Sequence, residues 1–146
     1  MSPRRLFSTV AVAEAVTWAL LLTGMALKYT GVTELGVRVF GMVHGVVFIA
    51  YCLVTVLLWV DQRWSFGRLV LGLVSAVPPF MTLWFERYAE RRGLVGESWL
   101  SRPDSSTRAQ RAACWLLSHH RVAVPGFVVA VATLTGVALV AGPPVG

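Results

Sequence analysis

The feature that most restricts what this chain can fold into is a long apolar run over residues 36–60, GVRVFGMVHGVVFIAYCLVTVLLWV. About 20 apolar residues in a helix are enough to cross the hydrocarbon core of a bilayer. The run also contains a titratable residue, His44, which lies between Gly41 and Gly45. Because glycines four residues apart let two helices approach closely, the pattern predicts that His44 lies at a helix–helix contact.

Three further apolar runs of similar length accompany this one. Charged residues make up 14% of the 146 residues, whereas a typical soluble domain has about 25%. We therefore predict an all-α fold, a polytopic membrane helix bundle with four transmembrane helices. The expected parts are a membrane domain with three spans, a basic loop, and a fourth span with a short tail: residues 1–92 (spans 6–27, 36–60 and 66–85), 86–120 and 121–146.

The first apolar run follows Arg4 and Arg5, as the apolar run of a secretory signal peptide follows its basic residues. However, the run is longer than the apolar region of most signal peptides, Glu14 interrupts it, and no small-x-small cleavage site follows it. A retained transmembrane helix is therefore the better interpretation. In the third run, Pro78 and Pro79 remove backbone donors, so we predict a kink near the middle of that span.

The loop after the third run is polar and holds seven of the thirteen basic residues. In its second half Ala112, Trp115 and Leu116 recur at helical intervals, which predicts a short amphipathic helix on the membrane surface. A net charge of +6 could indicate nucleic acid, but no nucleic-acid-binding motif accompanies it. The predicted partner is therefore the lipid bilayer and not a nucleic acid, with headgroup contacts from Lys28, Arg108 and Arg111.

The distribution of basic residues also predicts an orientation. With four spans, both termini lie on one side of the membrane, and that side holds four basic residues. The other side holds nine, namely Lys28, Arg38 and the seven arginines of the loop. The positive-inside rule then puts the loop 86–120 in the cytoplasm and both termini outside the cell membrane.

Depth arithmetic predicts that the titratable residues of the first two spans meet. At about 1.5 Å per residue, Glu14 lies roughly 12 Å below one membrane face and His44 roughly 12 Å from the opposite face. In a core of about 30 Å, their depths differ by only about 6 Å, which side chains can bridge. We expect a polar cluster that consists of Glu14, His44, Ser75 and Tyr51, with Thr17 nearby.

Small residues predict the same rotation of the two helices. Ala11, Ala15 and Ala19 form a stripe that Glu14 borders. Packing this stripe against Gly41 and Gly45 turns the side chains of Glu14 and His44 inward, toward each other.

Two interpretations of the cluster remain open. In the structural one, a hydrogen bond between Glu14 and His44 sets the helix register. In the functional one, the pair handles a proton or binds a ligand, which is the default hypothesis for ionisable groups inside a membrane. Haem ligation would need a second buried histidine, and His119 with His120 lacks a third metal ligand. We therefore expect no metal and no cofactor.

The known motifs of soluble enzymes are missing from the sequence. It contains no GxGxxG, no P-loop, no GxSxG and no HExxH. Enzymatic activity is therefore not expected.

Several phrases of the first three runs resemble one membrane-protein family. They are Glu14 in the first run, GMALKY at residues 24–29, RVFGMVHGVVFIAY at residues 38–51, and Pro79-Phe80 followed by Glu86-Arg87. Over about residues 6–92 the chain is similar to the small integral membrane proteins of domain of unknown function family 3817. The resemblance implies three core helices, signature positions at Glu14, Lys28, His44 and Gly45, and no particular activity. The chain departs from the family pattern at Ala15, where glycine is usual.

The first hypothesis for function is a non-enzymatic accessory or assembly subunit of a larger membrane complex, or a homo-oligomer. The alternative is a proton-coupled small-molecule transporter or channel component that uses Glu14 and His44. A lipid- or quinone-linked enzyme is a third interpretation, which no residue specifies.

Overall fold

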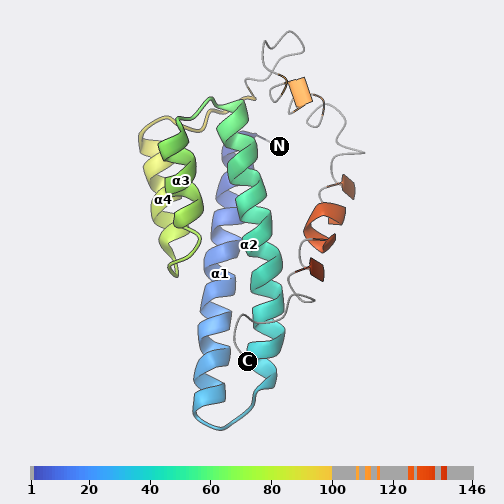
Figure 1. Ribbon diagram of the computed structural model, residues 1–146. Coiled ribbons are helices and arrows are strands. Elements are labelled where there is room, and N and C mark those ends of the chain that lie inside the picture. Colours follow the sequence, from blue (N-terminus) through green and yellow to red (C-terminus); the bar gives the residue numbers. More distant parts are fainter. Residues whose placement is uncertain are drawn as a thin grey trace. The chain divides into compact units, whose positions relative to one another are not determined.

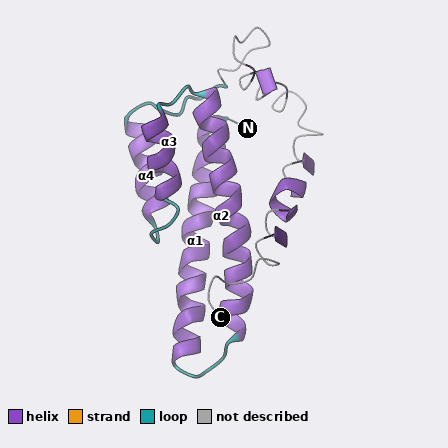
Figure 2. Cartoon of the chain, viewed as in Figure 1, coloured by secondary structure: helices purple, strands orange, loops and turns teal. Residues whose placement is uncertain are grey.

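The computed structural model describes residues 2–99 and, beyond them, residues 108, 111, 112, 115, 125, 126, 128–133, 136 and 137. The chain divides into two compact units, residues 1–100 and residues 101–146. The described residues of the second unit are all helical, but the bounds of the predicted amphipathic helix and of the fourth span lie outside the described residues. The first unit consists of four helices joined by short connections (Figures 1 and 2): α1 Pro3–Tyr29, α2 Leu35–Asp61, α3 Phe66–Val74 and α4 Met81–Arg91. The described part of the chain is therefore all-α, as predicted.

Helices α1 and α2 form a long antiparallel pair. Ser2 caps α1, because its side chain accepts a hydrogen bond from the backbone N–H of Arg5 at 3.3 Å, and Pro3 occupies the first turn, where it needs no donor. Each helix has 27 residues and, among the described residues, only these two helices are long and apolar enough to cross a membrane. At 1.5 Å per residue each is about 40 Å long. The first two predicted spans are thus continuous helices.

The prediction that residues 66–85 form a third span as one continuous helix is wrong. Helix α3 ends at Val74, the chain turns through residues 75–80, and α4 begins at Met81. Pro78 and Pro79 lack the N–H groups that a helix needs there, and the residue before a proline disfavours helical dihedrals. The turn closes at Phe80, which has a left-handed φ of 64°. With 9 and 11 residues, α3 and α4 are each about 14–17 Å long, far short of a core of about 30 Å.

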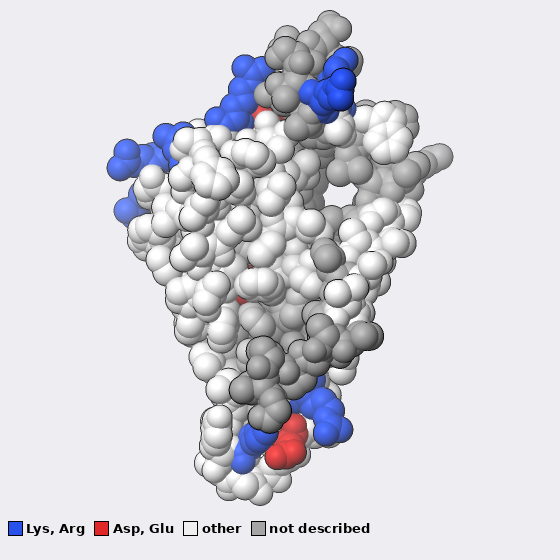
Figure 3. All heavy atoms as spheres, in the orientation of Figure 1, with Lys and Arg blue, Asp and Glu red and all other residues white. Residues whose placement is uncertain are grey.

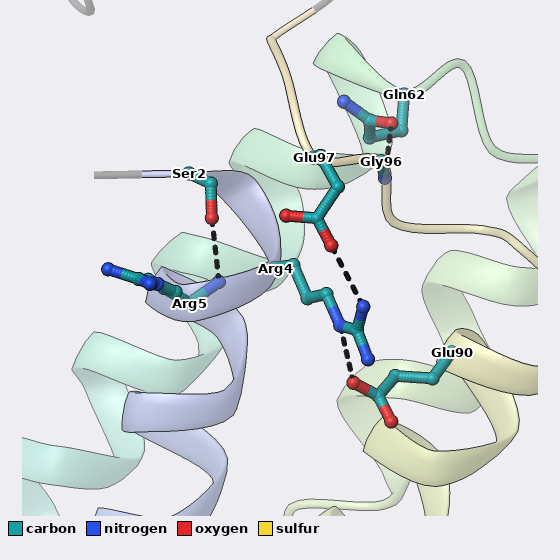
Figure 4. Close-up of polar contacts among 7 residues, drawn as sticks. All are labelled: Ser2, Arg4, Arg5, Gln62, Glu90, Gly96 and Glu97. Carbon is teal, nitrogen blue, oxygen red and sulfur yellow. Dashed lines mark hydrogen bonds and ion pairs between the residues drawn. The ribbon is translucent and has the colours of Figure 1, made fainter.

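The two short helices form an antiparallel hairpin whose ends lie at the N-terminal end of α1 (Figure 1). Arg4 of α1 donates from Nε to Glu90 of α4 at 2.7 Å and from a terminal nitrogen to Glu97 at 2.8 Å (Figure 4). Hydrogen bonds to Glu97 and Glu90 hold the pKa of the Arg4 guanidinium above its usual value. The prediction that the segment after residue 86 lies at the Lys28 end is therefore wrong for residues 86–99.

Two more hydrogen bonds hold the chain after α4 at this same end. The indole Nε1 of Trp64 donates to the carbonyl oxygen of Leu94 at 2.7 Å, and the backbone N–H of Gly96 donates to Gln62 at 3.1 Å (Figure 4). The hairpin turn lies beside the middle of α1, because the indole of Trp18 there donates to the carbonyl oxygen of Ala76 at 3.3 Å. Both open ends of the hairpin thus lie at the N-terminal end of α1, and its turn lies about halfway along α1.

An aromatic cluster fills the space between the hairpin and the long pair. Phe7 lies at its centre, with ring centroids 5.8 Å from Tyr51, 6.2 Å from Trp64 and 6.0 Å from Phe85. All four side chains are almost completely buried. Each buried aromatic side chain removes a large apolar area from its surroundings, so this cluster anchors α4 to α1 and α2.

A tight glycine contact between α1 and α2 lies outside the predicted stripes. A Cβ atom added to Gly24 would lie 2.8 Å from the backbone carbon of Gly36. Among the described residues, a Cβ atom added to Gly45 would meet nothing within 4 Å, and one added to Gly41 would meet only the Leu21 side chain, at 3.7 Å. On α1, Ala11 and Ala15 are buried but Ala19 is exposed. Ala11 faces the hairpin, since its carbonyl oxygen accepts a hydrogen bond from Thr82 at 3.2 Å.

Candidate functional site

The carboxyl group of Glu14 lies inside the helical bundle. Glu14 follows Phe7 and Ala11 at helical spacing, so it shares the face of α1 that packs against the other helices. The residue is 0% exposed, and neither of its carboxyl oxygens has a hydrogen-bond partner among the described residues. A buried polar group without a partner is rare in proteins and requires an explanation.

His44 of α2 is the nearest titratable neighbour. Its Nδ1 lies 3.8 Å from Oε1 of Glu14, which is within ion-pair distance but beyond a hydrogen bond. The Thr17 hydroxyl lies 3.2 Å from the same Nδ1 and donates its proton to the backbone carbonyl of Glu14 at 2.9 Å. Thr17 therefore links the Glu14 backbone to the imidazole, and the histidine tautomer decides which group donates between Thr17 and Nδ1.

Aromatic rings enclose the imidazole of His44. Its ring centroid lies 4.6 Å from that of Trp18 and 6.2 Å from that of Phe48. Trp18 also holds the hairpin turn through its bond to Ala76. The His44 side chain keeps 12% exposure while that of Glu14 has none, so only the histidine of this pair reaches the surface of the described residues.

A second polar group lies where α3 breaks. The hydroxyls of Tyr51 and Ser75 are 3.0 Å apart, and both donate to the carbonyl oxygen of Gly72, at 3.2 Å and 2.6 Å. The helix ends here, and the backbone N–H of Ala76 bonds to Leu73 instead. The two hydroxyls thus satisfy a carbonyl group that a continuous helix would have used.

The structure brings together two pairs of the predicted cluster. Glu14 meets His44, and Tyr51 meets Ser75, but no hydrogen bond or ion pair within residues 2–99 joins one pair to the other. Sequence reasoning missed Trp18, although its position four residues after Glu14 puts it on the same helix face. Pro78 and Pro79 mark the hairpin turn beside this site, in place of the predicted kink.

Metal-ligating side chains do not gather in the described part of the chain. No group of three or more His, Cys, Asp or Glu residues that could hold an ion occurs there. His119 and His120 lie outside the described residues.

Comparison with known proteins identifies the fold unit that carries the site. The profile of domain of unknown function family 3817 (DUF3817) matches residues 4–91. The chain belongs to the DUF3817 family. The resemblance read from the sequence is therefore confirmed, and all residues of both polar pairs lie within the matched segment.

One relative extends the comparison. A protein of Streptomyces coelicolor that is named a candidate membrane protein is 52% identical over 91 residues, which are 61% of this chain. The matching part is only 11% of that protein, so the chain spans about a tenth of its relative's length. No solved structure matches the chain.

Proposed function

We propose that this DUF3817 protein is an integral protein of the cell membrane that binds and releases a proton at the Glu14–His44 pair. The observation that carries this proposal is the fully buried Glu14 carboxyl group, which has His44 as its ion-pair neighbour at 3.8 Å. An isolated carboxylate in an apolar interior costs several kcal/mol. Two states avoid an isolated buried carboxylate. In one the Glu14 carboxyl group carries the proton, and in the other His44 carries it and pairs with the Glu14 carboxylate.

The surroundings of the pair support a path through His44. The aromatic cluster around Phe7 fills the bundle between Glu14 and the N-terminal end of α1. A proton that reaches Glu14 therefore passes through His44, the partly exposed member of the pair. Helix breaks at membrane depth occur where the backbone is enclosed by protein, and transporters use them at their binding sites. At the α3–α4 turn Ser75 and Ala76 are buried beside Trp18, whereas Val77 and Phe80 are exposed.

Proton flux into liposomes that contain the purified protein tests the proposal. We expect a pH-sensitive dye to report flux for the native chain and none for Glu14→Gln, which keeps the size of the side chain. Glu34→Gln is the matched control, because Glu34 is an exposed carboxylate in the α1–α2 connection. Equal flux for the native chain and Glu14→Gln contradicts the proposal. Loss of Glu14→Gln from the membrane supports a purely structural pair.

A second candidate function is an accessory or assembly module. It is favoured by the Streptomyces coelicolor relative, in which the matching segment is a small part of a much longer chain. The same segment therefore occurs within a chain of much greater length. Native mass spectrometry of the protein released from its own membrane in mild detergent tests this function. A complex with other subunits supports it, and a bare monomer contradicts it.

The hairpin leads to a revised orientation. Seven arginines lie at the end of the first unit where the chain enters α1, and two basic residues, Lys28 and Arg38, lie at the other. Figure 3 shows basic side chains in blue on one face of the molecule. The positive-inside rule then favours a cytoplasmic N-terminus, the reverse of the orientation derived from four spans. The arginine end comprises Arg4, Arg5, Arg63, Arg68, Arg87, Arg91 and Arg92.

A further inference from the structure

We propose that the outward face of α4 binds the headgroup of an anionic phospholipid. This inference rests on the proposed insertion of the protein in a membrane. The α4 outward face comprises Trp84, Arg87, Tyr88 and Arg91 of the helix and Arg92 directly after it. At 100° per residue the four helical residues share less than half of the helix circumference. Phe85 and Ala89, on the neighbouring side of the helix, are buried against the bundle.

The face changes from apolar to cationic along the helix. Trp84 is 50% exposed and its ring stacks on Tyr88, with centroids 5.6 Å apart and planes inclined by 13°. The guanidinium of Arg92 lies 5.6 Å from the centroid of the Tyr88 ring. Trp84 lies toward the hairpin turn, which is beside the middle of α1, whereas Arg92 lies at the end of the bundle where the chain leaves α4. This order matches a lipid, whose acyl chains lie deep and whose phosphate lies at the surface.

The cations of this face have no acidic partner among the described residues. Arg87, Arg91 and Arg92 are exposed and form none of the ion pairs in the first unit. The nearby carboxylates of Glu90 and Glu97 are bound to Arg4 instead. Guanidinium groups bind phosphate oxygens with two parallel hydrogen bonds, so adjacent unpaired arginines suit a phosphodiester headgroup. A free phosphate ion would make no use of the exposed Trp84 ring.

A lipid titration followed by native mass spectrometry tests this proposal. The protein in mild detergent is titrated with phosphatidylglycerol and, separately, with phosphatidylcholine of the same acyl chains. We expect phosphatidylglycerol to bind more tightly. The double variant Arg87→Gln/Arg91→Gln should lose about thirtyfold in affinity for it, because one arginine near an anionic surface contributes roughly fivefold.

The control removes one cation from the opposite end. Arg38→Gln should bind phosphatidylglycerol as the native chain does, whereas Arg87→Gln alone should lose roughly fivefold in affinity. Equal binding of the two lipids, an equal loss in this control, or displacement of phosphatidylglycerol by an equal concentration of inorganic phosphate would overturn the proposal. Alkaline carbonate extraction of membranes distinguishes failure of the lipid site from failure of the proposed membrane insertion. If carbonate extracts the protein, the proposed insertion is wrong. If the protein stays in the membrane but binds both lipids equally, only the lipid site is refuted.

Discussion

The contact between Gly24 and Gly36 makes a sharp prediction about the stability of the long helix pair. In Gly24→Ala the new methyl group would lie 2.8 Å from the carbon, 3.0 Å from the oxygen of Gly36 and 2.9 Å from the nitrogen of Val37. All three are backbone atoms, which no rotamer change can move. Carbon atoms in contact prefer separations of about 3.5–4.0 Å, so the two helices must move apart by roughly 0.7 Å at this end.

The expected effect is a net loss of about 1–2 kcal/mol in the free energy of unfolding. Overpacking of this kind costs about 1–3 kcal/mol, and the higher helix propensity of alanine offsets up to about 1 kcal/mol of that cost. Gly45→Ala is the matched control, because its methyl group would meet no atom of the described residues within 4 Å. The control should be neutral or stabilised by up to about 1 kcal/mol.

The assay is unfolding in mixed micelles with increasing dodecyl sulfate, followed by circular dichroism. Both variants exchange glycine for alanine in a long helix, so the difference between them reports the local packing. If Gly24→Ala is as stable as the native chain while Gly45→Ala is destabilised, the helices pack through the Gly41–Gly45 stripe and the contact described above is wrong.

Three further predictions test the hairpin and its position. Gly72→Ala should cost about 1–3 kcal/mol, because the added atom would lie 2.9 Å from both Phe85 and Thr55; an unchanged unfolding midpoint in the same assay argues against the docking of α3 on α4. Trp64→Phe removes the donor to the buried Leu94 carbonyl and should cost about 1–3 kcal/mol, with faster amide hydrogen exchange in residues 92–99; unaltered exchange there would contradict the role of this bond. In a variant without the native cysteines, a thiol reagent that cannot cross membranes should label Val32→Cys in intact cells and Ser98→Cys only after lysis. Identical labelling of both sites would mean that the third apolar run crosses the membrane.

The pairing of Glu14 with His44 followed from the sequence because both residues lie on long continuous helices. Rise per residue and span length are enough to compare depths in an antiparallel pair with a short connection. The same reasoning brought Ser75 to Tyr51, since both lie at comparable depth on neighbouring helices. It did not join the two pairs, because hydrogen bonding at the α3 break draws both hydroxyls to the Gly72 carbonyl.

Rise per residue and span length could not predict that the chain reverses direction after α3. An apolar run of 20 residues has the same composition whether it crosses a bilayer or folds back, and a proline pair predicts an interruption without its angle. The direction of α4 depends on contacts between distant segments, such as the packing of Phe85 against Phe7 and the bonds of Arg4 to Glu90 and Glu97. The prediction of one continuous helix over residues 66–85 put the arginines of residues 87–92 at the Lys28 end, and the predicted orientation depended on that placement.

The sequence by itself determined what depends on local composition and spacing: the helical class, the two long apolar helices, the family, and the depth of the buried titratable pair. Only the tertiary structure decided which glycines meet, where the third apolar run turns back, and which cations share a surface. The physical reason is that hydropathy and helical periodicity act within one segment, whereas close backbone approach, aromatic packing and ion pairing depend on residues far apart in the chain.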